Sequence, residues 1–82
     1  MSRDVDQPLR GGLIGCGYFA RNHLNGWREV DGADIVAVCD ENEDSLNSAS
    51  RDFGIGEKYS DALTMLEAAD LDFVDVVTQA PS

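Results

Sequence analysis

The residues Leu9-Arg-Gly-Gly-Leu-Ile-Gly-Cys-Gly-Tyr-Phe-Ala20 decide how this chain is expected to fold. A short apolar run leads into Gly15-Cys16-Gly17, and a helix-like pattern begins directly afterwards. The stretch therefore predicts a strand, a tight glycine turn and a helix. Small residues at Gly15, Gly17 and Ala20 have the spacing of a turn that binds the pyrophosphate of a dinucleotide. Glycine pairs also occur in strand–helix turns for purely structural reasons, so the surrounding sequence has to decide.

Each small residue has a physical role if the turn binds phosphate. Gly15 lets the chain turn sharply out of the strand, and Gly17 lets the backbone approach the pyrophosphate because it has no side chain. Ala20 is small enough for the helix to lie close to the strand. The N–H groups and the dipole at the helix N-terminus then attract phosphate.

Composition limits the class of partner. The chain has 82 residues, 43% of them apolar, so we expect one small globular domain. Six basic residues against sixteen acidic ones give a formal net charge of −10, which argues against nucleic acid or an anionic membrane surface as a partner. A phosphate-containing cofactor stays compatible with this charge, because a glycine turn binds phosphate through backbone N–H groups.

The ends and the cysteines indicate a compartment. Residues 1–8 are polar and are expected to form a flexible lead-in, without the pattern of a signal peptide. No apolar run approaches the roughly 18 residues of a membrane span. Cys16 and Cys39 are expected to be reduced thiols of a cytoplasmic protein, and the Cys and His spacing predicts no metal site. Cys16 is interpreted as a small, partly buried residue rather than as a nucleophile.

Helices and strands are expected to alternate. Apolar residues at Ala20, Leu24 and Trp27 predict a helix over residues 18–29, and the apolar run at 35–39 predicts a strand buried on both faces. A second helix is expected to open with the acidic residues 41–44 and to end at Gly54. Its expected buried side chains are Leu46, Ala49 and Phe53.

Two further strands and one helix complete the pattern. Lys58-Tyr59 suggests a short strand, and residues 73–77 a fourth one. The helix between them is expected to be capped by Ser60 or Asp61 and to end at Asp70. Its expected inward-facing side chains are Leu63, Leu66 and either Ala69 or Met65. The whole predicts an α/β fold, a Rossmann-like parallel sheet with strand order 3-2-1-4, partial, with four strands and three helices.

Asp40 directly follows the second expected strand, about 20 residues after Ala20. A dinucleotide fold places there the carboxylate that accepts hydrogen bonds from the adenosine ribose hydroxyls. The alternative is that Asp40 only caps the next helix, but the glycine turn favours the ribose role. Glu41 would place a second negative charge beside a 2′-phosphate, which favours NAD over NADP. Arg51, the nearest later basic residue, is expected on the solvated face of its helix.

His23 is the only histidine of the chain. It lies on or beside the apolar stripe of the first helix. We interpret it as a packed or surface-bridging residue and assign it no chemistry.

Several motifs, in this order and spacing, resemble the N-terminal domain of the Gfo/Idh/MocA oxidoreductases: residues 13–17, 22–24, 36–40, 53–54, 59–61 and 74–78. The resemblance runs from about Leu9 to Pro81. It implies a Rossmann domain that binds NAD or NADP, followed by an α/β substrate domain, in an enzyme that oxidises or reduces a sugar, cyclitol or related polyol. It assigns Gly15, Gly17, Tyr18 and Phe19 to the pyrophosphate turn, Asp40 to the ribose, and Thr78 to the cofactor-lining loop.

The chain departs from the family pattern in three places. Gly11 and Gly12 stand where at least one larger strand residue is usual, which should weaken the first strand. Gln79-Ala80 separates Thr78 from Pro81, where the proline commonly follows the threonine directly. The family's catalytic lysine–proline pair and its later aspartate and histidine would lie beyond the fourth strand, so no catalytic residue is assigned to this chain.

We therefore expect residues 9–82 to be a partial dinucleotide-binding domain, without the substrate domain, of an NAD-dependent sugar or polyol dehydrogenase. The full-length protein is expected to be a homo-oligomer. A non-catalytic dinucleotide-sensing regulator of the same fold is the main alternative, and a methyltransferase that binds S-adenosylmethionine is a third. The isolated chain is expected to be poorly stable or to associate through its fourth strand.

Overall fold

The computed structural model describes residues 7–17 and 20–77. Helices and strands alternate along them as the sequence predicts. The elements are β1 (Leu9–Ile14), α1 (Ala20–Arg28), β2 (Ala33–Cys39), α2 (Glu43–Phe53), β3 (Glu57–Tyr59), α3 (Ala62–Ala68) and β4 (Phe73–Val76).

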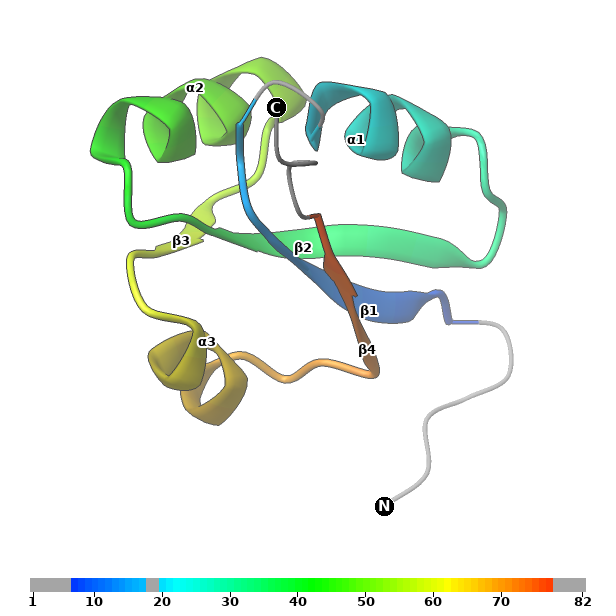
Figure 1. Ribbon diagram of the computed structural model, residues 1–82. Helices are drawn as coiled ribbons and strands as arrows, with labels where there is room; N and C mark the ends of the chain where they lie inside the picture. Colours follow the sequence, from blue (N-terminus) through cyan, green and yellow to red (C-terminus); the bar gives the residue numbers. More distant parts are fainter. Residues whose placement is uncertain (1–6, 18–19, 78–82) are drawn as a thin grey trace.

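The strands form one parallel sheet with the order β3-β2-β1-β4, which confirms the expected order. Figure 1 shows α1 and α2 over one face of the sheet and α3 over the other. This follows from right-handed crossovers, because the chain advances from β1 to β3 in one direction and then returns across the sheet to β4. The reversal places the switch point between β1 and β4.

The core has two layers, one on each face of the sheet. Leu13 and Val38 are fully buried beneath α1 and α2, where Leu24 and Leu46 meet them. On the opposite face Ala37 and Cys39 pack with Met65 and Ala69, which come from α3 and its C-terminus. Successive residues of β2 thus point into different layers, as expected for a strand buried on both faces.

Helix α2 begins two residues later than the sequence suggested. Its N-cap is Asn42, whose side-chain oxygen accepts a hydrogen bond of 3.0 Å from the Ser45 N–H. Asparagine is among the best N-cap residues, so Glu41 stays outside the helix. Gly54 ends the helix with φ 68°, in the left-handed conformation that glycine adopts easily, as predicted.

Helix α3 shows a different inward face from the expected one. Met65 and Ala69 are buried, but Leu63 is 68% and Leu66 49% exposed, so the expectation that both leucines face inward is wrong. Residues at i and i+4 share one helix face, and in this short helix the Met65–Ala69 pair occupies the face over the sheet. The helix ends at Ala68, with Ala69 rather than Asp70 at its C-cap.

The β4 side chains divide between the two faces. Phe73, Asp75 and Val77 point toward α1, while Val74 and Val76 point the other way and are 40% and 56% exposed. Association of the isolated chain through this strand stays a prediction.

Gly11 and Gly12 have a packing role in β1. The strand continues through both, with a shift of register between them. A Cβ on Gly11 would overlap the ring of Phe73, and one on Gly12 would meet the side chains of Leu71 and Met65. The two glycines therefore let bulky neighbours lie directly on the strand, which the sequence did not reveal.

Within residues 7–17 and 20–77, each helix is too short or too polar to cross a bilayer.

Candidate cofactor-binding site

The carboxyl ends of β1, β2 and β4 meet at one edge of the sheet and enclose a pocket of about 310 Å³. In an open α/β sheet this edge, at the switch point, is where ligands bind. The glycine turn lies on one side of the pocket, α2 on another and the end of β4 on a third. Its lining residues are Gly15, Gly17, Ala20, Asp40, Asn42, Ser45 and Val77.

Gly15 is held at a position that suits only glycine. Its φ is +96°, a conformation that residues with a Cβ rarely adopt, and its N–H donates a hydrogen bond of 2.8 Å to the Cys39 carbonyl. A Cβ would also overlap the carbonyl oxygen of Val77. The turn and the end of β4 therefore lie backbone against backbone.

Asp40 connects the glycine turn with the approach to α2. Its Oδ2 accepts a hydrogen bond of 2.6 Å from the Cys16 N–H, and its Oδ1 accepts one of 2.7 Å from the Asn42 N–H. The cap of α2 is Asn42, so the alternative that Asp40 only caps this helix does not describe its contacts. A carboxylate has about four acceptor positions, which leaves capacity for ligand hydroxyls.

Cys16 lies between the two glycines but points into the core. It is 6% exposed, and its thiol donates a hydrogen bond to the Cys39 carbonyl. Burial, then the neighbouring Asp40 carboxylate, raises the pKa of the Cys16 thiol to about 12. The thiol is therefore protonated at neutral pH and is a poor nucleophile, in line with its interpretation as a small buried residue.

A second pocket, of about 380 Å³, adjoins the first and shares Gly15 and Asp40 with it. Glu41 and Asp61 add two more carboxylates to its lining. Burial raises the pKa of the Cys39 thiol, and the charges of Asp40, Asp61 and Glu41 raise it further. None of the described residues that line either pocket is basic.

Asp61 caps α3 from this pocket. Its Oδ2 accepts hydrogen bonds of 2.9 Å from the N–H and from the hydroxyl of Thr64, and these bonds lower the pKa of the carboxyl. The sequence offered Ser60 or Asp61 as the cap but gave Asp61 no place in the site. Its position two residues after the end of β3 was the available signal, because parallel strands end at the same edge of a sheet.

The other residues named from the sequence either lie outside the described residues or do not line the pocket. Tyr18, Phe19 and Thr78 lie outside the described residues, so their assignment rests on the resemblance alone. Arg51 is on the solvated face of α2, as expected, with its side chain 73% exposed and 3.3 Å from Asp52. His23 contacts Asp75 on β4 rather than the pocket.

The residues that line the pocket suit two parts of a dinucleotide, the phosphates and the adenosine ribose. Ala20 begins α1 at the pocket, where the first-turn N–H groups of a helix lack intrahelical acceptors and favour an anion. Gly15 and Gly17 keep the turn free of side chains, and Asp40 presents acceptors for hydroxyls. Over the part of the chain that the structure describes, no three Cys, His, Asp or Glu side chains gather as a metal site would require.

Known proteins share both the sequence and the fold. D-apiose dehydrogenase from Paraburkholderia graminis is 56% identical over 74 residues, which are 90% of this chain and 20% of that protein. An inositol 2-dehydrogenase/D-chiro-inositol 3-dehydrogenase from Lacticaseibacillus casei is 38% identical over 69 residues, 82% of this chain and 20% of that protein. The crystal structure of an oxidoreductase from Agrobacterium radiobacter in complex with NAD+, L-tartaric acid and magnesium superimposes with a TM-score of 0.85 at 41% identity, covering 89% of this chain and 21% of that one.

The chain thus spans about one fifth of the length of the relatives that it matches. Residues 9–82 match the Gfo/Idh/MocA family, described as an oxidoreductase family with an NAD-binding Rossmann fold. The match covers nearly the whole chain and agrees with the observed strand order and with the glycine turn. The chain belongs to the Gfo/Idh/MocA family of oxidoreductases and corresponds to the NAD-binding Rossmann fold of that family.

Proposed function

We propose that this chain holds the adenosine and pyrophosphate half of NAD in a dehydrogenase that acts on a sugar, cyclitol or related polyol. The observation that carries the proposal is the placement of Asp40. Its carboxylate is bonded to the glycine turn on one side and to the approach to α2 on the other, at the rim of both pockets. A carboxylate fixed in this way can orient the ribose hydroxyls while the turn receives the phosphates.

The residues of the chain bind and orient the cofactor. Gly15, Gly17 and, by resemblance, Tyr18 and Phe19 would form the pyrophosphate turn, Asp40 would hold the ribose, and Thr78 would line the cofactor beyond β4. Bound NAD supplies the nicotinamide that accepts or donates hydride. We propose, from the family resemblance, that the base that removes the substrate's hydroxyl proton is the lysine of the family's lysine–proline pair.

The charge around Asp40 supports a preference for NAD over NADP. A 2′-phosphate on the adenosine ribose would stand beside Asp40, with Glu41 and Asp61 in the adjoining pocket. Like charges in close proximity disfavour binding, and the described residues that line the two pockets include no basic side chain to offset them.

The relatives support the substrate class. D-apiose dehydrogenase and inositol 2-dehydrogenase are named for polyhydroxylated substrates, a sugar and a cyclitol. Membership of an NAD-binding family removes the methyltransferase alternative. We further propose that the full-length protein is a cytoplasmic homo-oligomer that binds neither nucleic acid nor membranes.

The test is reduction of NAD by the full-length protein that carries this chain. Sugars and cyclitols would be offered in turn, and NADH would be followed by its absorbance. We expect turnover with at least one of them and a KM for NAD about 10- to 100-fold higher in Asp40→Ala, while the exposed Asp31→Ala control keeps the KM of the unsubstituted protein. NAD binding without turnover on any of them would favour the non-catalytic sensor instead.

A further inference from the structure

Asp75 on β4 accepts two hydrogen bonds from side chains of α1. Trp27 Nε1 lies 2.9 Å and His23 Nδ1 2.8 Å from the same oxygen, Oδ2. The Asp75 side chain is only 19% exposed, and its bond to Trp27 is partly buried, whereas the His23 side chain is 43% exposed. Burial by itself raises the pKa of this carboxyl, but the hydrogen bonds from Trp27 and His23 outweigh it and keep the pKa below its ordinary value. Asp75 is therefore a charged acceptor at neutral pH.

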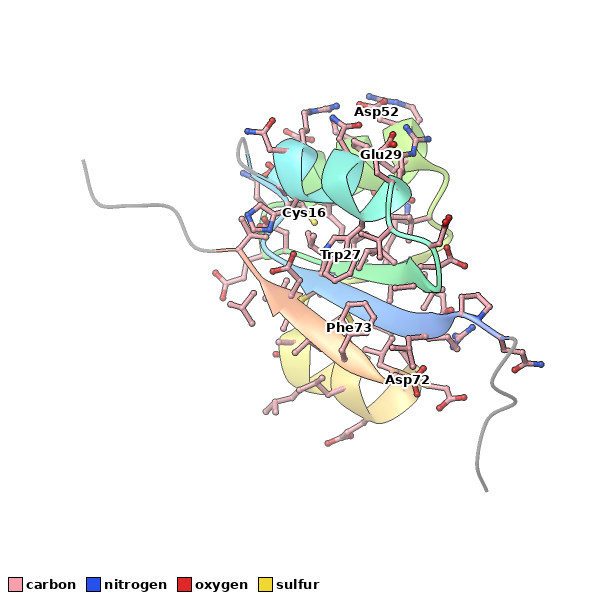
Figure 2. All side chains as sticks on the ribbon, turned by 90° about the vertical axis from the view of Figure 1, so that its right-hand side faces the viewer. Cys16, Trp27, Glu29, Asp52, Asp72 and Phe73 are labelled. Atoms are coloured by element: carbon pink, nitrogen blue, oxygen red, sulfur yellow. The ribbon has the colours of Figure 1, made fainter. Side chains whose placement is uncertain are left out.

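An aromatic contact accompanies this pair of hydrogen bonds. The rings of Trp27 and Phe73 lie 4.9 Å apart between centroids, and the Phe73 ring covers Gly11. Figure 2 shows Trp27 extending from α1 toward the sheet, and Phe73 on β4. Polar and apolar contacts thus join α1 and β4 at the same place, across the face of β1.

Helix α1 and the end of β4 form two walls of the pocket of about 310 Å³ at the glycine turn. Ala20 lies about one helical turn before His23 on α1, and it lines the pocket. Val77 follows Asp75 on the same face of the chain, and it lines the pocket from the other side. The Val77 N–H donates a hydrogen bond of 2.8 Å to the Ile14 carbonyl, and its own carbonyl lies against Gly15. A shift of β4 relative to α1 would therefore change the width of this pocket.

We propose that Asp75 is a positioning residue for the dinucleotide site: through His23 in the first turn of α1 and Trp27 in its last turn, it fixes α1 relative to the end of β4. The proposal rests on the function proposed above. It also gives His23 a role, as a bridging donor on α1 rather than a catalytic base.

The test compares two ligands in the full-length protein. Asp75→Val removes the acceptor and keeps a residue suited to a strand, whereas Asp75→Asn keeps an oxygen that Trp27 and His23 can reach. Dissociation constants for NAD and for adenosine would be measured for both variants, for Asp40→Ala and for an Asp31→Asn control. Adenosine lacks the pyrophosphate, so it reports on the Asp40 side of the site alone.

We expect Asp75→Val to weaken NAD binding about tenfold and adenosine binding less than about twofold. Asp75→Asn and Asp31→Asn should bind NAD nearly as the unsubstituted protein does, and Asp40→Ala should weaken both ligands. Trp27→Phe, which keeps the ring and removes the donor, should weaken NAD about threefold and serves where Asp75→Val does not fold.

Four results would overturn the proposal. NAD binding that is unchanged in Asp75→Val and in Trp27→Phe would show that the hydrogen bonds to Asp75 do not act on the site. Equal loss of NAD and adenosine binding would point to general destabilisation, and equal loss in Asp75→Asn and Asp75→Val would show that the acceptor oxygen is not the positioning group. An unsubstituted protein that binds neither ligand would overturn the proposed function as well.

Discussion

The Asp40 carboxylate fixes the glycine turn, because its Oδ2 accepts a hydrogen bond of 2.6 Å from the backbone N–H of Cys16. The two residues come from the ends of neighbouring strands, β2 and β1, so one side chain joins the two halves of the site. Its other oxygen accepts from Asn42 just before α2. The residue proposed to bind ribose is thereby also bonded to the glycine turn proposed to bind the pyrophosphate.

Replacement of Asp40 should therefore weaken NAD binding for two reasons. Asp40→Ala removes the ribose acceptors and releases the Cys16 and Asn42 N–H groups. Hydrogen bonds to a charged group contribute about 1.5–3 kcal/mol, so we expect a loss of affinity of about 10- to 100-fold. Asp40→Asn, which keeps one acceptor, should lose less. Calorimetric titration measures both variants, with Asp31→Ala as control, and an unchanged affinity in Asp40→Ala would refute the role of this residue.

Gly15→Ala should destabilise the fold, because the added Cβ meets the Val77 carbonyl and because φ is +96°. We expect a loss of about 1–3 kcal/mol in the free energy of unfolding. Gly26→Ala is the matched control, since a Cβ at Gly26 in α1 has no neighbour within 4 Å. That change should stabilise the protein by about 0.5–1 kcal/mol. Denaturant unfolding measures both, and equal effects of the two substitutions would contradict the account of the turn.

The contact between Gly11 and Phe73 makes a prediction about paired substitutions. Gly11→Ala should destabilise the protein by about 1–3 kcal/mol, because its Cβ would overlap the Phe73 ring. Phe73→Leu removes the ring atoms that cause the overlap. The loss of unfolding free energy in the double variant should therefore be smaller than the sum of the losses in the two single variants. A double-mutant cycle of unfolding free energies measures this difference. Strict additivity would mean that the two residues do not compete for this space.

The cap of α3 predicts a dependence of stability on pH. The hydrogen bonds from Thr64 lower the pKa of Asp61 in the folded state, so folding favours its ionised form. The stabilisation is complete well above the unfolded pKa of about 3.9 and is lost as the pH falls below it, through the folded value. Asp61→Asn keeps a capping oxygen but does not titrate.

Unfolding of the unsubstituted protein and of Asp61→Asn would be compared from neutral pH down to about pH 2. The stability advantage of the aspartate should shrink in the acidic part of this range. A difference that stays constant with pH would show that the Asp61 carboxylate does not contribute through its charge.

The strand order could be predicted because it depends on patterns along the chain, and the edge proposed to bind the cofactor follows from it. The apolar run of β2, the glycine turn and the alternation of elements each constrain the topology locally. The inward face of α3 could not be predicted, since Leu63 and Leu66 are as apolar as Met65 and only the position of the sheet selects between them. The register of one element on another is a property of the packed fold.

The same reason explains which site residues were missed. The position of Asp40 at this edge of the sheet could be predicted from its place after a strand, but Asp61 follows a strand so short that its carboxyl end was uncertain. The partnership of His23 with Asp75 joins residues far apart in sequence, and only the packing of α1 on β4 brings them together. The glycines of β1 were expected to weaken the strand. The Phe73 ring that covers Gly11 comes from another strand, so this packing is not visible in the local sequence.

The most direct test of the central claim, that Asp40 and its acidic neighbours select NAD, is calorimetric titration of the unsubstituted full-length protein with NAD and with NADP under identical conditions. The charges of Asp40, Glu41 and Asp61 predict that NAD binds at least about tenfold more tightly. NADP binding as tight as that of NAD, or tighter, would contradict it.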